Sequence, residues 1–270
     1  MGWLIPDWQK TVVYIGQEIV KENKVDKIQI GTGALLQVSG IFCLITCKHV
    51  ILDENGSLRK NMFCAFNSKT GNIIYRKIDD IKSKFNVEWY FHKNKDVDIA
   101  IVVFGLDPNN DDVKTIDETA FSYIKDIDVA EEVFVLGFQP GLPISKMRPV
   151  VRSGIISRLE EDRTFYIDAS VFPGNSGSPV LLKPSPIILK ERNIQFGSTH
   201  LGRFIGISSG YIPYKEVAVS LQTGRPRIVF EENTGLSKVW SVDYIKEVIT
   251  SEEFNKQLDK IKDDKNGGQS

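Results

Sequence analysis

The sequence has few cysteines and few histidines, and its charges almost cancel. Of the 270 residues, three are cysteine and three are histidine, and the formal net charge at pH 7 is −1. Three cysteines without repeated close pairs do not make a disulfide framework, so we expect free thiols and a reducing, cytoplasmic location. A balanced charge gives no strong attraction to nucleic acid or to anionic lipid, and neither is expected as a partner.

Other absences narrow the class of protein further. The histidines and cysteines do not follow a metal-ligand spacing, so no metal and no other cofactor is expected. No apolar run reaches the length of a membrane helix. The N-terminus lacks the basic start and long apolar core of a signal peptide. A content of 41% hydrophobic and 26% charged residues is typical of a soluble globular protein.

The chain consists mainly of short apolar runs separated by Gly, Asn, Asp and Pro. The first half contains TVVYI, GALLQV, IFCLIT, MFCAF and DIAIVVF, and the second contains VFVLGF, VVRSGIIS, TFYIDA, PVLL and RFIGISS. No helical segments alternate with them, which disfavours a parallel sheet and favours barrels or a sandwich. The segment DPNNDD at 107–112 is the most linker-like stretch. We therefore predict one domain over residues 1–110 and a second over 111–240.

The end of the chain, residues 241–270, has a different pattern. Apolar residues recur at helical spacing over 242–249, and Ser251 is a candidate N-cap for a second helix with Phe254, Leu258 and Ile261 on one face. We expect two short helices packed on the second half. The polar tail DDKNGGQS is expected to be disordered.

A serine stands in an unusual setting in VFPGNSGSPVLL, residues 171–182. Ser176 is bracketed by two glycines and an asparagine, and a strand-like run follows. This pattern is compatible with a tight surface turn or with a bend that aims the hydroxyl at a substrate. A serine hydroxyl becomes a good nucleophile only when a base takes its proton and a third group holds that base.

The base and the third group have few candidates. His92 lies in the basic segment YFHKNK and His200 in GSTHLG, and both are interpreted as loop residues. His49 follows the run IFCLIT directly, at a strand end, although it could also be a hydrogen-bonded core histidine. Asp98 opens the run DIAIVVF, and Asp96 lies on the same side as its competitor. We favour Asp98 because it adjoins the buried run, although it could also be a turn residue.

Four motifs in order carry a family resemblance. GTGALLQ, TCKHV, DIAIV and PGNSGSP together resemble the chymotrypsin-like serine peptidases, most closely the HtrA-like bacterial branch, and the resemblance covers roughly residues 10–210. It implies an all-β fold of two antiparallel six-stranded β-barrels, with the active site between them. In such a fold His49 and Asp98 come from the first barrel and Ser176 from the second.

The resemblance also implies the role of each residue. His49 would act as general base, Asp98 would orient it and Ser176 would attack a peptide carbonyl. The N–H groups of Gly174 and Ser176 would form the oxyanion hole. The substrate would be a protein or a peptide.

The same resemblance implies a set of substrate-binding residues. Ser170 would lie at the base of the pocket for the side chain before the cut, and its lack of charge predicts uncharged, small to medium side chains there. Ser208, Ser209 and Gly210 would belong to a strand that pairs with the substrate backbone.

The chain departs from the family pattern in two respects. Asn175 stands where secreted digestive relatives have an aspartate, so activation by N-terminal clipping is disfavoured. About 60 residues follow FIGISSG, too few for the PDZ domain that HtrA proteins usually carry. The stretch LKPSPIILKERNIQFGSTHLG is expected to be a surface insertion. Because fold does not imply function, a catalytically silent scaffold remains the alternative, with an esterase as a weaker one.

Overall fold

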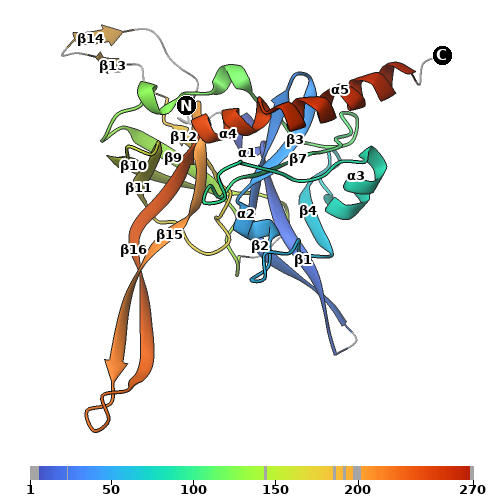
Figure 1. Ribbon diagram of the computed structural model, residues 1–270. Helices are drawn as coiled ribbons and strands as arrows, with labels where there is room; N and C mark the ends of the chain where they lie inside the picture. The colour runs from blue at the N-terminus through green and yellow to red at the C-terminus, as the bar shows by residue number, and fades with distance from the viewer. Residues whose placement is uncertain are drawn as a thin grey trace.

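The computed structural model describes residues 6–22, 24–142, 145–184, 187–190, 193–196 and 202–267. Two sheets lie side by side, and the helices α4 (Val242–Ile249) and α5 (Glu252–Gly267) run across one end of both (Figure 1). The mainly β fold with C-terminal helices is as expected. None of the helices in these ranges is long and apolar enough to cross a membrane.

The first half forms an eight-stranded sheet with the order β5-β4-β1-β2-β3-β7-β6, and β8 pairs in parallel with β2. Its strands are β1 (Val12–Lys21), β2 (Lys24–Val38), β3 (Ile41–Thr46), β4 (Met62–Asn67), β5 (Ile73–Lys77), β6 (Tyr90–Phe91), β7 (Ala100–Val103) and β8 (Ile116–Asp117). The hydrogen-bonded order is an open path, whereas the resemblance implies a closed ring of six. The edge strand β6 has two residues and therefore offers few ladder bonds for closure.

The second half closes into a six-stranded barrel, as expected, with the order β10-β11-β16-β15-β12-β9. Its strands are β9 (Glu132–Gly137), β10 (Val150–Leu159), β11 (Thr164–Ala169), β12 (Pro179–Leu182), β15 (Arg203–Val219) and β16 (Pro226–Ser241). A separate hairpin of β13 (Ile187–Lys190) and β14 (Asn193–Phe196) lies between β12 and β15 in the chain. This hairpin is part of the predicted insertion.

Short helical segments connect the strands. They are α1 (Pro6–Gln9), α2 (Lys48–Ile51), α3 (Ile78–Phe85) and the 3₁₀ turns η1 (Glu118–Ala120) and η2 (Ile124–Asp126). The strand β8 still belongs to the first sheet, so the strands change sheets between residues 117 and 132. The division predicted at residue 110 stays a prediction.

The C-terminal helices pack on the first half as well as on the second, which corrects the expectation. The Phe254 ring of α5 meets the Tyr90 ring edge to face with centroids 5.1 Å apart, and Tyr90 Oη donates to Gln257. Phe254, Leu258 and Ile261 belong to the larger hydrophobic core, which includes the first sheet and some residues of the second half. The helix α5 continues to Gly267, and the expected disorder of the tail stays a prediction. The helix α4 contacts the second half, where the Tyr244 ring meets the Trp240 ring of β16 edge to face, so the two helices link both sheets.

His92 is buried rather than solvated, which corrects a second expectation. Its Nε2 lies 2.6 Å from Glu247 of α4, and its ring meets Tyr244 edge to face. Arg163 also donates to Glu247. Burial raises the pKa of Glu247, but the hydrogen bonds from His92 and Arg163 outweigh it, so that pKa lies below its ordinary value. The histidine is therefore a structural residue that fixes α4 to the body. His200 lies outside the described residues.

The linker-like segment is anchored rather than free. The Asp111 carboxylate is fully buried and makes two hydrogen bonds to the Arg76 guanidinium, at 2.8 and 3.0 Å. Arg76 also donates to the carbonyl of Gly105. A buried carboxylate needs such partners, so this segment is part of the first half.

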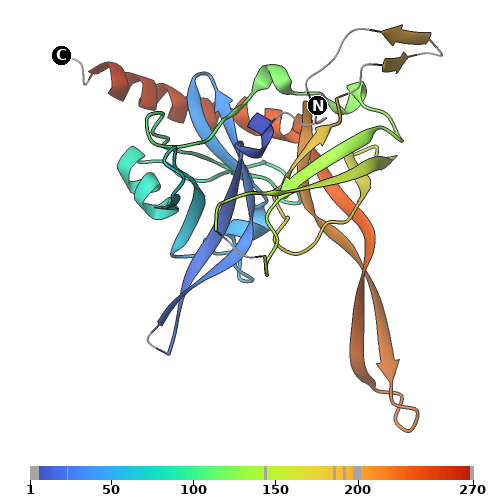
Figure 2. The ribbon, with the colours of Figure 1, turned by 180° about the vertical axis from the view of Figure 1, so that it is seen from behind.

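Two hairpins extend beyond the sheets on the side where α2 lies. One joins β1 to β2 and the other joins β15 to β16, and α2 lies between them in both ribbon views (Figures 1 and 2). Since α2 carries His49, the two hairpins flank the region that the sequence selects as the site.

Candidate active site

His49 lies on the single helical turn α2 directly after β3. Val50 and Ile51 of this turn are buried and fix it to the core. The His49 side chain is 50% exposed. A short turn at a strand end thus presents the imidazole to solvent while its neighbours hold it in place.

Asp98 lies against His49, and Asp96 does not. The Asp98 carboxylate accepts hydrogen bonds from His49 Nδ1 at 2.7 Å, from the His49 backbone N–H at 2.9 Å and from Ser209 Oγ at 2.6 Å. Asp96 is exposed, and its backbone N–H bonds to Asn94. Burial raises the pKa of Asp98, but the His49 and Ser209 hydrogen bonds outweigh it, so this pKa lies below its ordinary value. An ionised Asp98 holds the proton on Nδ1 and leaves the Nε2 lone pair free.

The turn that carries Ser176 is held by buried polar contacts. The Asn175 side chain is fully buried, donates to the Phe138 carbonyl at 2.9 Å and accepts from the Phe172 N–H at 3.1 Å. Gly174 has a φ of +91°, a backbone conformation that favours glycine. These constraints fix the chain path on both sides of Ser176.

Two backbone N–H groups of this turn, those of Gly174 and Ser176, are candidate donors to a bound oxyanion. Asn175, Gly177 and Ser178 donate their N–H groups to backbone carbonyls. Within the described residues, no hydrogen bond engages the N–H of Gly174 or of Ser176. Two neighbouring free donors beside a serine hydroxyl are the arrangement that an oxyanion hole requires.

Ser209 connects the two halves of the site. The strand register shifts between Ser208 and Gly210, which leaves Ser209 at a β-bulge. Its hydroxyl donates to Asp98, and its carbonyl accepts from Ser176 Oγ at 3.2 Å. His49, Asp98 and Ser176 therefore converge around one residue. Among the residues that the structure covers, no hydrogen bond joins Ser176 directly to His49.

Ser208 does not face a substrate, which corrects its predicted role. It is fully buried, and its hydroxyl pairs with that of Ser237 at 2.8 Å. Its N–H donates to Ser178 and its carbonyl accepts from Gly177. The strand turns Ser208 inward because side chains alternate along it.

Gly210 and Ser170 remain near the surface. A Cβ on Gly210 would lie 3.6 Å from Ser176 Oγ, so the missing side chain leaves space beside the hydroxyl. Ser170 is exposed. Its predicted place at the base of a pocket stays a prediction.

Sequence reasoning missed the role of Thr32. Its hydroxyl, fully buried, donates to the Gly174 carbonyl at 2.7 Å and accepts from the Phe138 N–H at 3.0 Å. Gly177 approaches it so closely that a Cβ there would lie 2.1 Å from the Thr32 carbonyl oxygen. Thr32 lies in the motif GTGALLQ, which supported the family resemblance, but the sequence did not indicate that its hydroxyl bonds to the turn of Ser176. This threonine joins the first sheet to the turn of Ser176.

Cys47 lies under the site but does not look like a ligand. Cys47, His49 and Asp98 offer ligand atoms within 4.8 Å of one another. Cys47 is fully buried, its thiol donates to the Ser208 carbonyl, and burial raises its pKa well above the ordinary value. A metal needs the thiolate, so a neutral thiol here disfavours metal binding.

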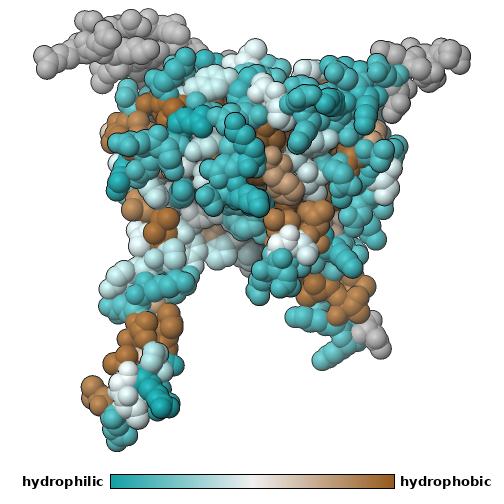
Figure 3. Space-filling model, viewed as in Figure 1, coloured by the Kyte–Doolittle hydropathy of each residue, from teal (hydrophilic) through white to brown (hydrophobic). Residues whose placement is uncertain are grey.

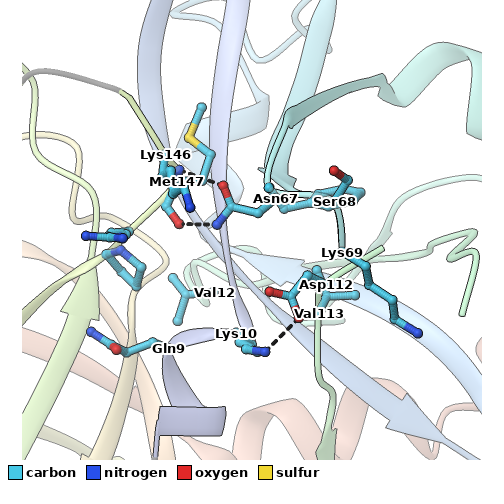
Figure 4. Close-up of a pocket in the computed structure, with 14 residues that line it drawn as sticks. Gln9, Lys10, Val12, Asn67, Ser68, Lys69, Asp112, Val113, Lys146 and Met147 are labelled. Atoms are coloured by element: carbon cyan, nitrogen blue, oxygen red, sulfur yellow. Dashed lines mark hydrogen bonds and ion pairs between the residues drawn. The ribbon is translucent and has the colours of Figure 1, made fainter. Parts of the chain in front are cut away.

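A cavity of about 350 Å³ lies elsewhere (Figure 4), and within the described residues no hydrogen bond joins its Ser68 hydroxyl to a histidine or a carboxylate. Lys10 pairs with Asp112 on one side of it, at 2.6 Å. On the other side, the Asn67 amide exchanges two hydrogen bonds with the backbone of Met147. A peptide can bind in an open groove along a strand, so a peptidase site need not be a cavity. We therefore take the arrangement of His49, Asp98 and Ser176 as the candidate active site.

The comparison with known families agrees with this geometry. Residues 31–184 match the family model described as a trypsin-like peptidase domain, and the chain belongs to this family. The match spans the motifs of His49, Asp98 and Ser176. A comparison with curated proteins finds no match.

Proposed function

We propose that the protein is a serine endopeptidase that hydrolyses peptide bonds through an acyl-enzyme intermediate. The observation that carries the proposal is the set of contacts by which Ser209 joins Asp98, with its partner His49, to Ser176. Membership of the trypsin-like peptidase family supports it. The substrate is a protein or a peptide.

The proposed reaction starts at the Ser176 hydroxyl. A rotation about χ1 exchanges its hydrogen bond with the Ser209 carbonyl for one with His49 Nε2, a rearrangement compatible with the looser geometry of free enzymes. His49 takes the proton as the oxygen attacks the peptide carbonyl, and it returns the proton to the leaving amine. Water, deprotonated by His49, then releases the acyl group and restores the Ser176 hydroxyl. Asp98 stabilises the imidazolium at both stages.

The developing oxyanion would bind to the N–H groups of Gly174 and Ser176. The loss of one such donor typically costs about 3–4 kcal/mol of transition-state stabilisation. Because Thr32 and Asn175 fix the turn on either side of these groups, the two donors need little reorganisation during the reaction.

For specificity, we propose that Ser209 and Gly210 pair with the substrate backbone and that Ser170 lies near the side chain before the cut. The uncharged Ser170 favours uncharged, small to medium residues at that position. A peptide-library profile dominated by Arg and Lys would refute this preference.

We place the enzyme in the HtrA-like branch and in the cytoplasm as further proposals. Asn175 supports the first, because its amide bonds to the backbone of Phe138 and Phe172 and offers no carboxylate to a newly cut N-terminus. The three cysteines, all free and buried, support the second.

The direct test is cleavage of casein by the purified chain, compared with its Ser176→Ala variant. We expect turnover by the parent and none above background by the variant. Ser83→Ala, at an exposed position on α3, is the matched control and should cleave like the parent. Equal cleavage by Ser176→Ala and the parent would rule the assignment out.

A silent peptide-binding scaffold is the second candidate. The observation that favours it is the Ser176 hydroxyl, which bonds to Ser209 rather than to His49. A scaffold would bind peptides with equal affinity before and after Ser176→Ala and would cleave none of them.

A further inference from the structure

The hairpin between β15 and β16 extends far from the barrel as an isolated two-stranded ribbon, which we call the arm (residues 213–234). It stands apart from the body in the ribbon and space-filling views (Figures 1 and 3). At the usual rise per residue, the paired part of the arm is about 20 Å long. Two-stranded ribbons are marginally stable alone in water, so an arm of this length calls for a covering partner.

The arm exposes apolar side chains on both of its faces. Its exposed large apolar residues, each more than half exposed, are Tyr214, Val217, Val219, Leu221, Ile228, Val229 and Phe230. Directly opposed residues share a face, so the pair of Val217 with Val229 lies on one face and the pair of Glu216 with Phe230 on the other. Several large apolar side chains exposed on one short hairpin, rather than single scattered ones, mark an interaction site.

The distribution of charges along the arm indicates which kind of partner fits it. Arg225 and Arg227 lie at the tip, and Glu231 and Glu232 lie nearer the barrel. Within the described residues, Arg225, Arg227 and Glu232 make no ion pair, whereas Glu231 pairs with Lys215. Three basic and three acidic residues balance over the arm, which disfavours an anionic membrane or nucleic acid.

We propose that the arm is the interface of a homodimer, in which the arms of two copies lie side by side with opposite directions. A two-fold axis requires a self-complementary surface, and this packing brings the basic tip of each arm to the acidic base of the other. It also covers the apolar side chains on the face of each arm that carries Phe230. The arm has 22 residues and only part of them can face one partner, so this interface is smaller than the standard of roughly 20–30 residues per side. The proposal is independent of the peptidase function.

The test is the mass of the full-length chain in solution by sedimentation velocity, over a range of concentrations. We expect a species with twice the 30.5 kDa of one chain. Phe230→Lys should raise the dissociation constant by about tenfold or more, since it puts a charge into the apolar face. Val129→Lys, at an exposed apolar position outside the arm, is the matched control and should leave the mass unchanged.

Charge reversal tests the direction of the arms. The double change Arg225→Glu and Arg227→Glu should weaken the dimer, and so should Glu216→Lys with Glu232→Lys. A chain with all four changes should regain it. All variants should keep the urea midpoint of the monomer, because the arm lies outside both cores. A chain that stays monomeric at about 100 μM, or an oligomer unaffected by these changes, would overturn the proposal.

Discussion

Thr32→Val removes one buried hydroxyl and nearly preserves the shape of the side chain. In the parent this hydroxyl donates to the Gly174 carbonyl and accepts from the Phe138 N–H. After the change the carbonyl keeps its bond from Gln29, at 3.1 Å, but the Phe138 N–H has no acceptor among the described residues. An orphaned buried donor costs about 1–3 kcal/mol and a lost net hydrogen bond about 1 kcal/mol, so the free energy of unfolding should fall by about 2–4 kcal/mol.

Urea unfolding followed by tryptophan fluorescence measures this change. Thr32→Ser keeps the hydroxyl and is the control, with a loss well below that of the valine variant. We also expect a lower kcat with a nearly unchanged KM for Thr32→Val, because the peptide group next to the oxyanion donors loses an anchor. A valine variant within about 0.5 kcal/mol of the parent would refute the view that Thr32 joins the sheets.

Three further changes test other contacts. Asp98→Asn should lower kcat about 10⁴-fold in a folded protein, because the amide favours the wrong imidazole tautomer; a loss below tenfold would contradict the role of Asp98. Asp111→Ala should lower the free energy of unfolding, measured in urea, by about 3 kcal/mol, because the partly buried charge of Arg76 loses its carboxylate partner. The lowered pKa of Glu247 contributes stability that is present above the ordinary value of 4.5 and is lost as the pH falls through the folded-state value. The decrease of the urea midpoint from pH 7 to pH 3.5 should therefore be larger for the parent than for Glu247→Gln. Equal decreases in the two proteins would argue against this linkage.

Local patterns predicted the strands well where one run of apolar residues faces a core. The runs IFCLIT and PVLL, for example, coincide with β3 and β12. The pattern missed β16, because much of this strand is exposed and is interrupted by EEN and by Gly235. Such a strand is defined by its pairing with β15 rather than by its own composition.

Residues whose role depends on a distant partner were the least predictable. His92 looked solvated because its neighbours are basic, yet its partner Glu247 lies 155 positions away in the chain. Ser209 acquires its place between Asp98 and Ser176 from a bulge, which the sequence does not mark. Asp98, by contrast, was favoured over Asp96 on local grounds, because it adjoins a buried strand. Its contact with His49 follows from the same placement.

The most direct measurement is labelling of the purified chain with a fluorophosphonate probe, with the modified residue located by mass spectrometry. The account predicts one label, on the Ser176 hydroxyl, that is lost in Ser176→Ala and strongly reduced in His49→Ala. An unlabelled chain, or a label on Ser176 that His49→Ala leaves undiminished, would contradict it.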